Sequence, residues 1–305
     1  MRLWCRIEFF ESRDGTRLRS AVWDAVRGVP ARGVCIVLGG QAEFLEKYEE
    51  VFGELAERGF AGASLDWRGQ GGSQRLLPDP LKAHVRDFSD YDEDLSSFLD
   101  EIVRPLSGEP PVVLAHSMGA HILLRTLHAR PDRFASAVMT APMLRADMRG
   151  FPTWLVRLVC NTQNRVGLGD RWVWGMKMRD PLRLLFGLNL VTSDEERFAR
   201  NQALLRDCPN LRLAGPTWGW LQAAQRSMNQ VMAPGFAEEI STPLLLFGAE
   251  RDRIVKTDAV REFAQRLPRG RYVEIPGAEH EILMEKEPVR AVFWQQFDRF
   301  IGDFG

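Results

Sequence analysis

The sequence predicts an α/β fold in which a mostly parallel central sheet is flanked by helices and carries an inserted helical segment. Strand-like apolar runs alternate with helix-like stretches up to residue 142 and again from residue 236, which is typical of parallel strands joined by right-handed crossovers. Residues 143–235 lack this alternation, and Pro and Gly interrupt their short helical pieces. A buried strand, a sharp turn and a helix follow one another across residues 111–127. These three observations define the expected fold class.

The length of the chain favours a division into two parts. With 305 residues, it exceeds the ~250–300 residues at which a single hydrophobic core stops growing. We therefore expect one large core domain, formed by residues 1–142 and 236–305, with residues 143–235 inserted into it as a helical lid. The word lid refers to residues 143–235 throughout.

The first half of the core is expected to begin with a hairpin and to continue as strand, helix and strand. Asp14-Gly15 separates two strand-like runs and is a hairpin turn signal. Gly59 follows an apolar helical stripe and is expected to end that helix. The expected elements are strands at 2–10, 16–23, 33–38 and 60–65, with a helix over 44–58.

The elements beyond residue 66 follow the same alternation, interrupted by the lid. A glycine-rich loop occupies 66–73, and Ser89 with Asp92 forms a capping-box pattern at the start of a helix. The residues expected on the inward face of that helix are Tyr91, Leu95, Phe98 and Ile102. The remaining elements are strands at 134–140, 243–247 and 271–275, a helix over 258–267, and a closing helix whose inward residues are Val289, Phe293, Phe297 and Phe300.

Composition and charge exclude several classes of protein. Hydrophobic residues make up 45% and charged residues 27% of the chain, which is ordinary for a globular protein. A net charge of −1 gives no overall field that would attract nucleic acid. The N-terminus lacks the apolar run of a signal peptide, and no stretch approaches the ~18 apolar residues of a membrane span. The four cysteines are widely spaced, which indicates free thiols in a reducing compartment, so we expect a cytoplasmic protein.

The turn at Ser117 is the strongest chemical signal in the chain. Ala115-His116-Ser117-Met118-Gly119 follows the G-x-S-x-G pattern of a nucleophile elbow, in which a serine sits on a strained strand-to-helix turn. Residues 115 and 119 must be small because they crowd each other, and Ala115 departs from glycine by one methyl group. The helix that begins at Met118 directs its free N–H groups toward the Ser117 oxygen. The alternative is that Ser117 only caps the helix.

A serine hydroxyl needs a base to accept its proton, and the base needs a carboxylate to orient it. In this kind of fold the order along the chain is Ser, acid and His, each after a strand. Asp252 follows the strand 243–247, and His280 follows the strand 271–275 as the only histidine after the lid. Glu250 competes with Asp252, which we prefer because it precedes the apolar pair Ile254-Val255.

A second set of residues is expected to surround these three side chains. The backbone N–H groups of Met118 and Gln41 are candidates for an oxyanion hole, because Gly39-Gly40 lets that backbone turn in close; the alternative is that the two glycines only form a tight turn. We expect no metal or other cofactor, since the sequence has no metal-ligand cluster and no dinucleotide fingerprint. The candidates for substrate binding are Gly40, Glu43, His84, His116, Trp154 and Arg157.

The motifs resemble those of the serine α/β-hydrolases, and more closely the lysophospholipase and monoacylglycerol lipase branch (lysophospholipase L2-like proteins). The resembling segments are G-G-Q-A-E-F-L-E-K-Y at 39–48, D-W-R-G-Q-G-G-S at 66–73, A-H-S-M-G at 115–119, G-A-E-R-D at 248–252 and G-A-E-H at 277–280. The resemblance implies an α/β-hydrolase fold and a Ser117–Asp252–His280 triad that cleaves esters through an acyl-enzyme. Departures are Ala115 in place of Gly and Gly39 where many relatives have His.

Other activities on the same fold are partly excluded. Dehalogenases and epoxide hydrolases carry Asp at the elbow, and the latter need lid tyrosines, whereas Tyr48, Tyr91 and Tyr272 all lie outside the lid. A small-molecule carboxylesterase, a thioesterase or a carbon–carbon bond hydrolase would use the same triad and stays open. A peptidase is possible, but no sequence feature points to one. A non-catalytic binding protein of this fold would often lack a triad member.

The lid differs from the core in charge. It contains 13 Lys and Arg against 7 Asp and Glu, a net charge of +6, which leaves −7 on the rest of the chain. It also holds five of the nine tryptophans. We expect this segment to face a single-chain lipid ester, with apolar side chains such as Leu155 and Leu158 on the acyl chain. Arginines would meet a phosphate or a membrane surface; they include Arg145, Arg149, Arg157, Arg179 and Arg183. The alternative is that the aromatic residues fill the lid's own core and the arginines are solvated.

Overall fold

The computed structural model describes residues 5–147, 150–178 and 180–303. Its centre is an eight-stranded sheet in the order β1-β2-β4-β3-β6-β7-β9-β10. β2 is antiparallel to both of its neighbours, and the other neighbouring strands are parallel. The strands are β1 (Arg6–Glu11), β2 (Arg17–Trp23), β3 (Val34–Leu38), β4 (Ala61–Asp66), β6 (Val112–His116), β7 (Ser136–Thr140), β9 (Leu244–Ala249) and β10 (Gly270–Ile275). The predicted fold class is confirmed.

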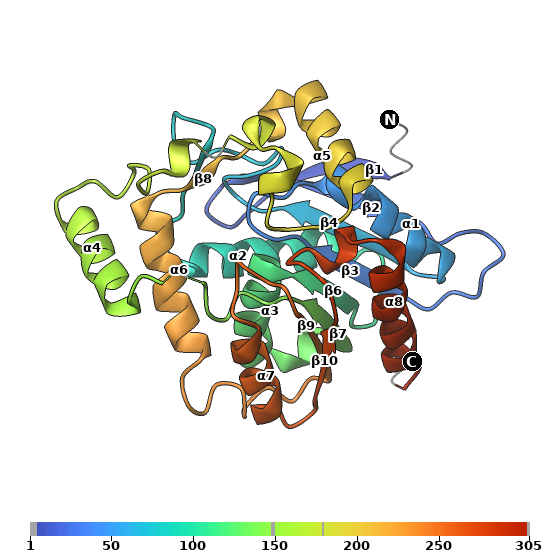
Figure 1. The fold of residues 1–305 in the computed structure, drawn as a ribbon. Helices are drawn as coiled ribbons and strands as arrows, with labels where there is room; N and C mark the ends of the chain where they lie inside the picture. The colour runs from blue at the N-terminus through green and yellow to red at the C-terminus, as the bar shows by residue number, and fades with distance from the viewer. Residues whose placement is uncertain (1–4, 148–149, 179, 304–305) are drawn as a thin grey trace.

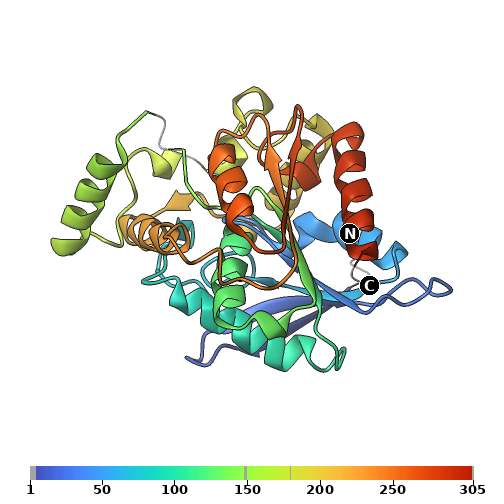
Figure 2. The same cartoon turned by 90° about the horizontal axis from the view of Figure 1, so that it is seen from below.

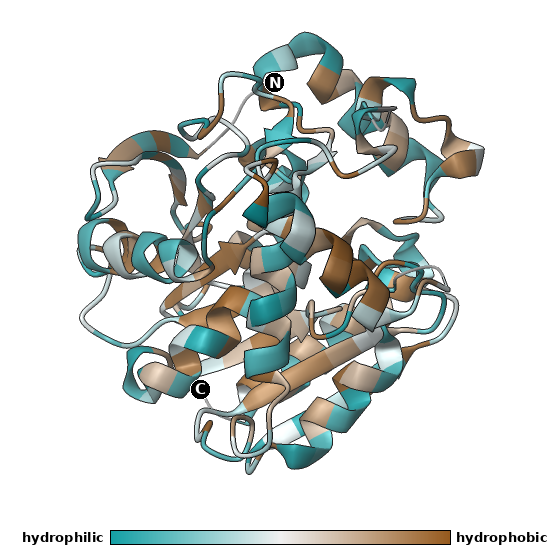
Figure 3. Cartoon of the chain, turned by 90° about the vertical axis from the view of Figure 1, so that its left-hand side faces the viewer, coloured by the Kyte–Doolittle hydropathy of each residue, from teal (hydrophilic) through white to brown (hydrophobic). Residues whose placement is uncertain are grey.

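Helices cover both faces of the sheet, as Figure 1 and Figure 2 show from two directions. The core helices are α1 (Glu49–Glu57), α2 (Ser89–Phe98), α3 (Ser117–Ala129), α7 (Thr257–Arg266) and α8 (Glu287–Gly302). Ile36 of β3 packs in the hydrophobic cluster that contains α2, α3 and α7, whereas Val37 packs in the cluster that contains α1 and α8. Alternate residues of the buried strands therefore serve opposite faces. Figure 3 shows apolar colouring on the central strands and a mixture of polar and apolar colouring on the helices around them.

The expected glycine stop of the first helix is confirmed. α1 ends at Glu57, and Gly59 adopts φ +87°, a left-handed conformation that suits glycine after a helix. A Cβ atom at this position would lie 2.1 Å from the Pro30 carbonyl oxygen. The helix itself starts differently from the expectation, because a 3-10 turn over Leu45–Tyr48 precedes it.

The capping box expected at Ser89 and Asp92 is wrong. Ser89 is the first residue of α2. Phe88 occupies the N-cap position, and its side chain makes no capping hydrogen bond. The Asp87 side chain accepts the Ser89 N–H at 3.0 Å instead, so the acceptor lies two residues earlier than the pattern indicated. Asp92 is engaged elsewhere, in an ion pair with Arg125 of α3 at 2.6 Å. The inward face is confirmed: Tyr91, Leu95, Phe98 and Ile102 are all buried.

The lid contains α4 (Thr153–Arg165), α5 (Glu195–Asp207) and α6 (Trp218–Val231), together with β8 (Gly215–Pro216), which pairs with β5 (Lys82–Ala83) of the core. α6 joins the lid to the core, since the Trp220 indole donates to the Tyr91 hydroxyl of α2 at 3.3 Å. α4 packs on α6 and protrudes from the body of the protein in both cartoon views. The division of the chain into core and lid stays a prediction, although the sheet strands of the core all lie outside 143–235.

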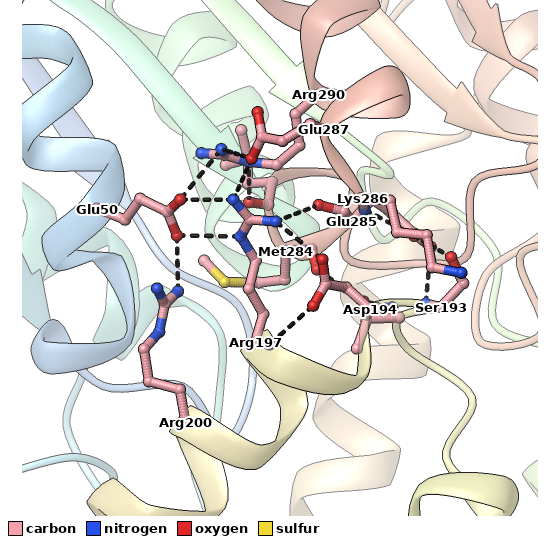
Figure 4. Close-up of polar contacts among 12 residues, drawn as sticks. Glu50, Ser193, Asp194, Arg197, Arg200, Met284, Glu285, Lys286, Glu287 and Arg290 are labelled. Atoms are coloured by element: carbon pink, nitrogen blue, oxygen red, sulfur yellow. Dashed lines mark hydrogen bonds and ion pairs between the residues drawn. The ribbon is translucent and has the colours of Figure 1, made fainter.

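A cluster of charged residues fastens α5 to the core (Figure 4). Arg197 donates to both carboxylate oxygens of Glu50 in α1, at 3.0 and 2.5 Å, and to the Glu285 carbonyl at 3.0 Å. Arg200 also contacts Glu50, at 2.8 Å, and Arg290 of α8 reaches it at 3.2 Å. Because the Arg197 side chain is only 11% exposed, these charge-assisted bonds stand in a partly buried setting where each is stronger than at the surface.

Further observations bear on the expected cellular setting. Cys5, Cys35, Cys160 and Cys208 are free thiols. Within the described ranges, no helix has the length and apolarity that crossing a membrane requires.

The Arg197 cluster predicts a difference between two arginines of the lid. Arg197→Met should lower the free energy of unfolding by about 1–3 kcal/mol, because it leaves Glu50 partly buried with fewer partners. Arg226→Met is the matched control: its ion pair with Asp87 has both side chains more than half exposed and should contribute almost nothing. Calorimetry should show a lower melting temperature only for Arg197→Met, and equal shifts for the two variants would contradict this account.

Candidate active site

Ser117 lies at the junction of β6 and α3, in the conformation expected of a nucleophile elbow. Its φ of 49° is left-handed, which costs a residue with a side chain about 1–2 kcal/mol. Gly119 makes the turn sterically feasible, because a Cβ atom there would lie 2.5 Å from the carbonyl oxygens of both Leu38 and Gly39. The elbow therefore fits directly against the end of β3, and the Ser117 side chain is held at one place.

The structure brings Ser117, His280 and Asp252 into one hydrogen-bonded series. His280 Nε2 lies 3.0 Å from Ser117 Oγ, and His280 Nδ1 lies 2.7 Å from Asp252 Oδ2. The three residues follow β6, β10 and β9, at the carboxyl ends of parallel strands. With Nδ1–H donated to the carboxylate, Nε2 is free to accept the serine proton.

The choice between Asp252 and Glu250 has a geometric explanation. Asp252 Oδ1 accepts the backbone N–H groups of Ile254 and Val255 at 2.8 and 2.9 Å, so Oδ2 remains directed at His280. Glu250 instead accepts the Gly277 N–H at 2.7 Å, on the exposed side of the loop. Only Asp252 is thus placed to orient the imidazole.

The loop after β3 lies against the nucleophile. We call residues 39–43 the oxyanion loop. A Cβ atom on Gly40 would lie 3.1 Å from Ser117 Cβ, so only glycine fits here without displacing a neighbour. The Gln41 N–H donates to no backbone carbonyl among the described residues. Met118 is the second residue of α3, so its N–H has no partner within the helix. Their role as oxyanion donors stays a prediction.

Glu43 is buried behind the oxyanion loop. Its carboxylate accepts the Gly40 N–H, the Tyr48 hydroxyl at 2.6 Å and the Lys47 ammonium at 2.6 Å. Burial disfavours the charged form, but the neighbouring Lys47 outweighs it and lowers the pKa of Glu43 to about 2. Lys47 also pairs with Glu281 at 2.6 Å, next to His280. Glu43, which the sequence suggested for substrate binding, therefore has its oxygens committed to the loop.

His116 is buried beneath the imidazole of His280. The two ring centroids lie 4.8 Å apart, and His116 Nδ1 is 3.0 Å from the Thr140 hydroxyl. Burial lowers the pKa of His116 to about 4, so its ring is neutral near pH 7 and places no second positive charge beside the base. This arrangement supports His280 from behind, whereas the sequence had placed His116 among the substrate contacts.

The other candidate substrate contacts lie away from Ser117. His84 Nδ1 is 2.9 Å from the Thr217 hydroxyl, at the start of α6. Trp154 is 68% exposed and Arg157 is also exposed, both on the protruding α4. No hydrogen bond joins these three side chains to the triad among the described residues, and α4 packs on α6. Arg149 and Arg179 lie outside the described residues.

Sequence reasoning missed several residues that the structure places around the site. Lys47 and Tyr48 hold Glu43, Thr140 holds His116, and Gln70 bonds the oxyanion loop through its side-chain amide at 2.8 Å. Gln70, Lys47 and Tyr48 all belong to the segments that carried the family resemblance. For Gln70 and Lys47 that membership was the only signal, whereas Tyr48 also lies on the apolar stripe expected for the helix over 44–58.

Comparisons with known proteins show the family of the chain. The family model described as serine aminopeptidase, S33, matches residues 29–287. Lysophospholipase L2 of Escherichia coli (strain K12) is 33% identical over 306 residues, which cover 93% of this chain and 86% of that protein. Monoacylglycerol lipase of Mycolicibacterium smegmatis is 24% identical over 280 residues, 91% of each chain.

Solved structures share the fold at lower sequence identity. A soluble variant of monoglyceride lipase from Saccharomyces cerevisiae superposes with a TM-score of 0.76 at 16% identity, covering 99% of this chain and 97% of that one. A thermostable carboxyl esterase from Bacillus coagulans gives a TM-score of 0.79 at 18% identity, covering 98% of each. These matches show the α/β-hydrolase fold.

Three substitutions test the hydrogen-bonded series. Ser117→Ala should abolish labelling by a fluorophosphonate probe and lower turnover of a nitrophenyl ester by about 10⁴-fold or more. Asp252→Asn should lower turnover by about 10⁴-fold, because it favours the wrong imidazole tautomer. Glu250→Gln, in the same loop, is the matched control and should retain wild-type turnover. Wild-type hydrolysis by Ser117→Ala, or a severe loss for Glu250→Gln alone, would rule out the assignment.

Proposed function

The chain belongs to the family described as serine aminopeptidase, S33, and from this premise we propose that it is a serine hydrolase that cleaves carboxylic esters of single-chain lipids. The observation that carries the proposal is the series Ser117–His280–Asp252, with contacts of 3.0 and 2.7 Å. The similarity to lysophospholipase L2, at 33% identity over 93% of the chain, supports lysophospholipids as the first substrate class, with monoacylglycerols as the second.

The reaction proceeds in two halves through a covalent intermediate. Ser117 Oγ attacks the ester carbonyl carbon while His280 Nε2 takes the serine proton. The carbonyl oxygen becomes an oxyanion that accepts the Gln41 and Met118 N–H groups. When the intermediate collapses, the bond to the alcohol breaks, His280 returns the proton to the departing alkoxide, and the acyl group stays on Ser117. Water, deprotonated by His280, then releases the fatty acid in the same way.

The lid supports a lipid substrate through the apolar side chains that it exposes. Trp154 and Trp174 are 68% and 70% exposed, whereas Trp218 and Trp220 are buried, so the first two are the tryptophans available to a lipid. Large exposed apolar side chains gathered in one segment are a feature of proteins that contact lipid or a partner. In the lid they include Phe151, Trp154, Leu158, Val166, Trp174, Leu185 and Leu188.

We infer that these exposed side chains contact a lipid bilayer and bring the site to its substrate. Trp154 and Leu158 lie four residues apart, so they share one side of the helix that begins at Thr153. Arg157 and Arg165 are exposed on the same helix and would meet anionic head groups. The proposed contact is peripheral and rests on the net positive charge of the lid together with its exposed aromatic residues.

A substrate panel tests the proposed chemistry. Purified protein should hydrolyse lysophospholipids and monoacylglycerols faster than long-chain diacyl lipids, because one acyl chain enters a lidded site more easily than two. The panel also includes short nitrophenyl esters, acyl-CoA thioesters and an aminopeptidase substrate, with products measured by mass spectrometry. A preference for short soluble esters with no gain from chain length would defeat the lipid assignment and leave the triad intact.

Vesicle binding tests the lid surface. The protein should sediment with vesicles of phosphatidylethanolamine and phosphatidylglycerol, less at high salt. Replacing both Trp154 and Leu158 by Ala should weaken partitioning by about tenfold or more, since each large apolar side chain contributes roughly 1.5–3 kcal/mol when buried. Phe9→Ala removes an exposed aromatic residue of the core and is the control. Equal partitioning of the two variants would contradict the inference.

A further inference from the structure

The oxyanion loop is braced by a single side-chain amide from a neighbouring loop. Gln70 lies in the loop after β4 and is 3% exposed. Its Nε2 donates to the Gly40 carbonyl at 2.8 Å and to the Glu43 carbonyl at 3.2 Å, and its Oε1 accepts the Ala42 N–H at 3.2 Å. One amide thus contacts three backbone groups of residues 39–43.

The bond to the Gly40 carbonyl determines where the next N–H points. In a trans peptide the carbonyl of one residue and the N–H of the following residue face opposite ways in one plane. Holding the Gly40 carbonyl on Gln70 therefore directs the Gln41 N–H to the other side of that plane. The Gly40 N–H is itself held by the Glu43 carboxylate, so both peptide groups of Gly40 are fixed.

The loop contains backbone strain that needs such support. Ala42 adopts φ 64°, which costs a residue with a side chain about 1–2 kcal/mol and persists only where the surroundings hold it. Gln70 bonds the Ala42 N–H on one side and the carbonyls of Gly40 and Glu43 on the other. Without these bonds the loop can relax by rotating the peptide that carries the Gln41 N–H.

The brace is itself part of a rigid frame. The Trp67 indole, three residues before Gln70, donates to the Gly39 carbonyl at 2.9 Å. Asp66 accepts the backbone N–H groups of Leu45 and Gly72 at 3.0 and 2.8 Å. The loop over 66–73 is thereby bonded to the first residue of the oxyanion loop and to Leu45 just beyond its end, which holds Gln70 in a fixed position.

We propose that Gln70 is a positioning residue of the oxyanion hole, acting through the Gly40–Gln41 peptide and not through contact with substrate. The role requires a donor and an acceptor on one planar group, which an amide supplies and neither a carboxylate nor an apolar side chain can. The inference rests on the proposed hydrolysis of esters at Ser117, but it needs no particular lipid as substrate.

The first test compares two losses in the same loop, with a soluble nitrophenyl ester as substrate. Gln70→Leu should lower kcat by about 10- to 100-fold with little change in KM, because a displaced oxyanion donor acts mainly on the transition state. Affinity for a boronic acid, which mimics the tetrahedral intermediate, should fall in parallel. Ser73→Ala removes a buried bond to the Asp66 carbonyl, 2.6 Å in the native protein, and should leave kcat and boronic acid affinity near wild type.

The second test uses a group that can donate in only one protonation state. In Gln70→Glu, the protonated carboxyl can still donate to the Gly40 carbonyl, whereas the carboxylate repels it. The ratio of variant to wild-type kcat should therefore be highest at low pH and fall as pH rises. For Gln70→Leu the same ratio should not depend on pH. Thermal melting of each variant shows whether a loss of kcat comes from misfolding or from a displaced oxyanion donor. If Gln70→Leu does not fold, the pH profile of Gln70→Glu alone decides the test.

The outcomes distinguish this inference from the proposed function. A kcat for Gln70→Leu within twofold of that for Ser73→Ala, or a loss confined to KM, would overturn the role of Gln70 while ester hydrolysis stands. A wild-type protein that hydrolyses nitrophenyl esters but no lipid would defeat the lipid assignment and leave Gln70 as proposed. A wild-type protein that hydrolyses no ester would overturn both.

Discussion

The close contact between Gly119 and the end of β3 is the constraint on which the rest of the site depends. A Cβ atom on Gly119 would lie 2.5 Å from the carbonyl oxygens of Leu38 and Gly39, so no side chain fits at this position. β3 and β6 are parallel neighbours with Leu38 opposite Ala115, so the two strands end level. The nucleophile and the oxyanion loop are therefore held against each other at the ends of β3 and β6. The loops after β9 and β10 need only bring Asp252 and His280 to Ser117.

Buried charged residues connect the oxyanion loop to the loop that carries the base, His280. Lys47 pairs with both Glu43 and Glu281 at 2.6 Å, so one ammonium group links the residue that holds Gly40 to the residue that follows His280. Charges are costly to bury unless they are paired and hydrogen-bonded. Each of these carboxylates has that compensation, which ties the geometry of the two loops together.

Much of the site could be predicted because its elements carry strong local signals. The buried runs around β3, β6 and β9, the small residues flanking Ser117 and the order of the triad all follow from short stretches of sequence. The triad carboxylate was harder to predict, because Asp252 and Glu250 lie two residues apart and differ in which backbone N–H groups they reach. Gln70 had no signal of its own, because a polar residue in a glycine-rich loop has no period from which its partner could be inferred. The capping box predicted for α2 was wrong for a similar reason. Asp87 and Ser89 are both good cap residues, and the sequence pattern does not show which of them accepts the N–H group.

The order of the elements along the chain has a consequence for the protein while it is being made. Ser117 is synthesised before the lid, and Asp252 and His280 after it. A nascent chain can fold β3, β6 and the elbow early, since domains form from the N-terminal side as they emerge. Such a chain holds a strained serine without its base until residue 280 has appeared. The three triad side chains can therefore come together only after the lid has been synthesised. A chain interrupted before residue 280 lacks the base that ester hydrolysis needs.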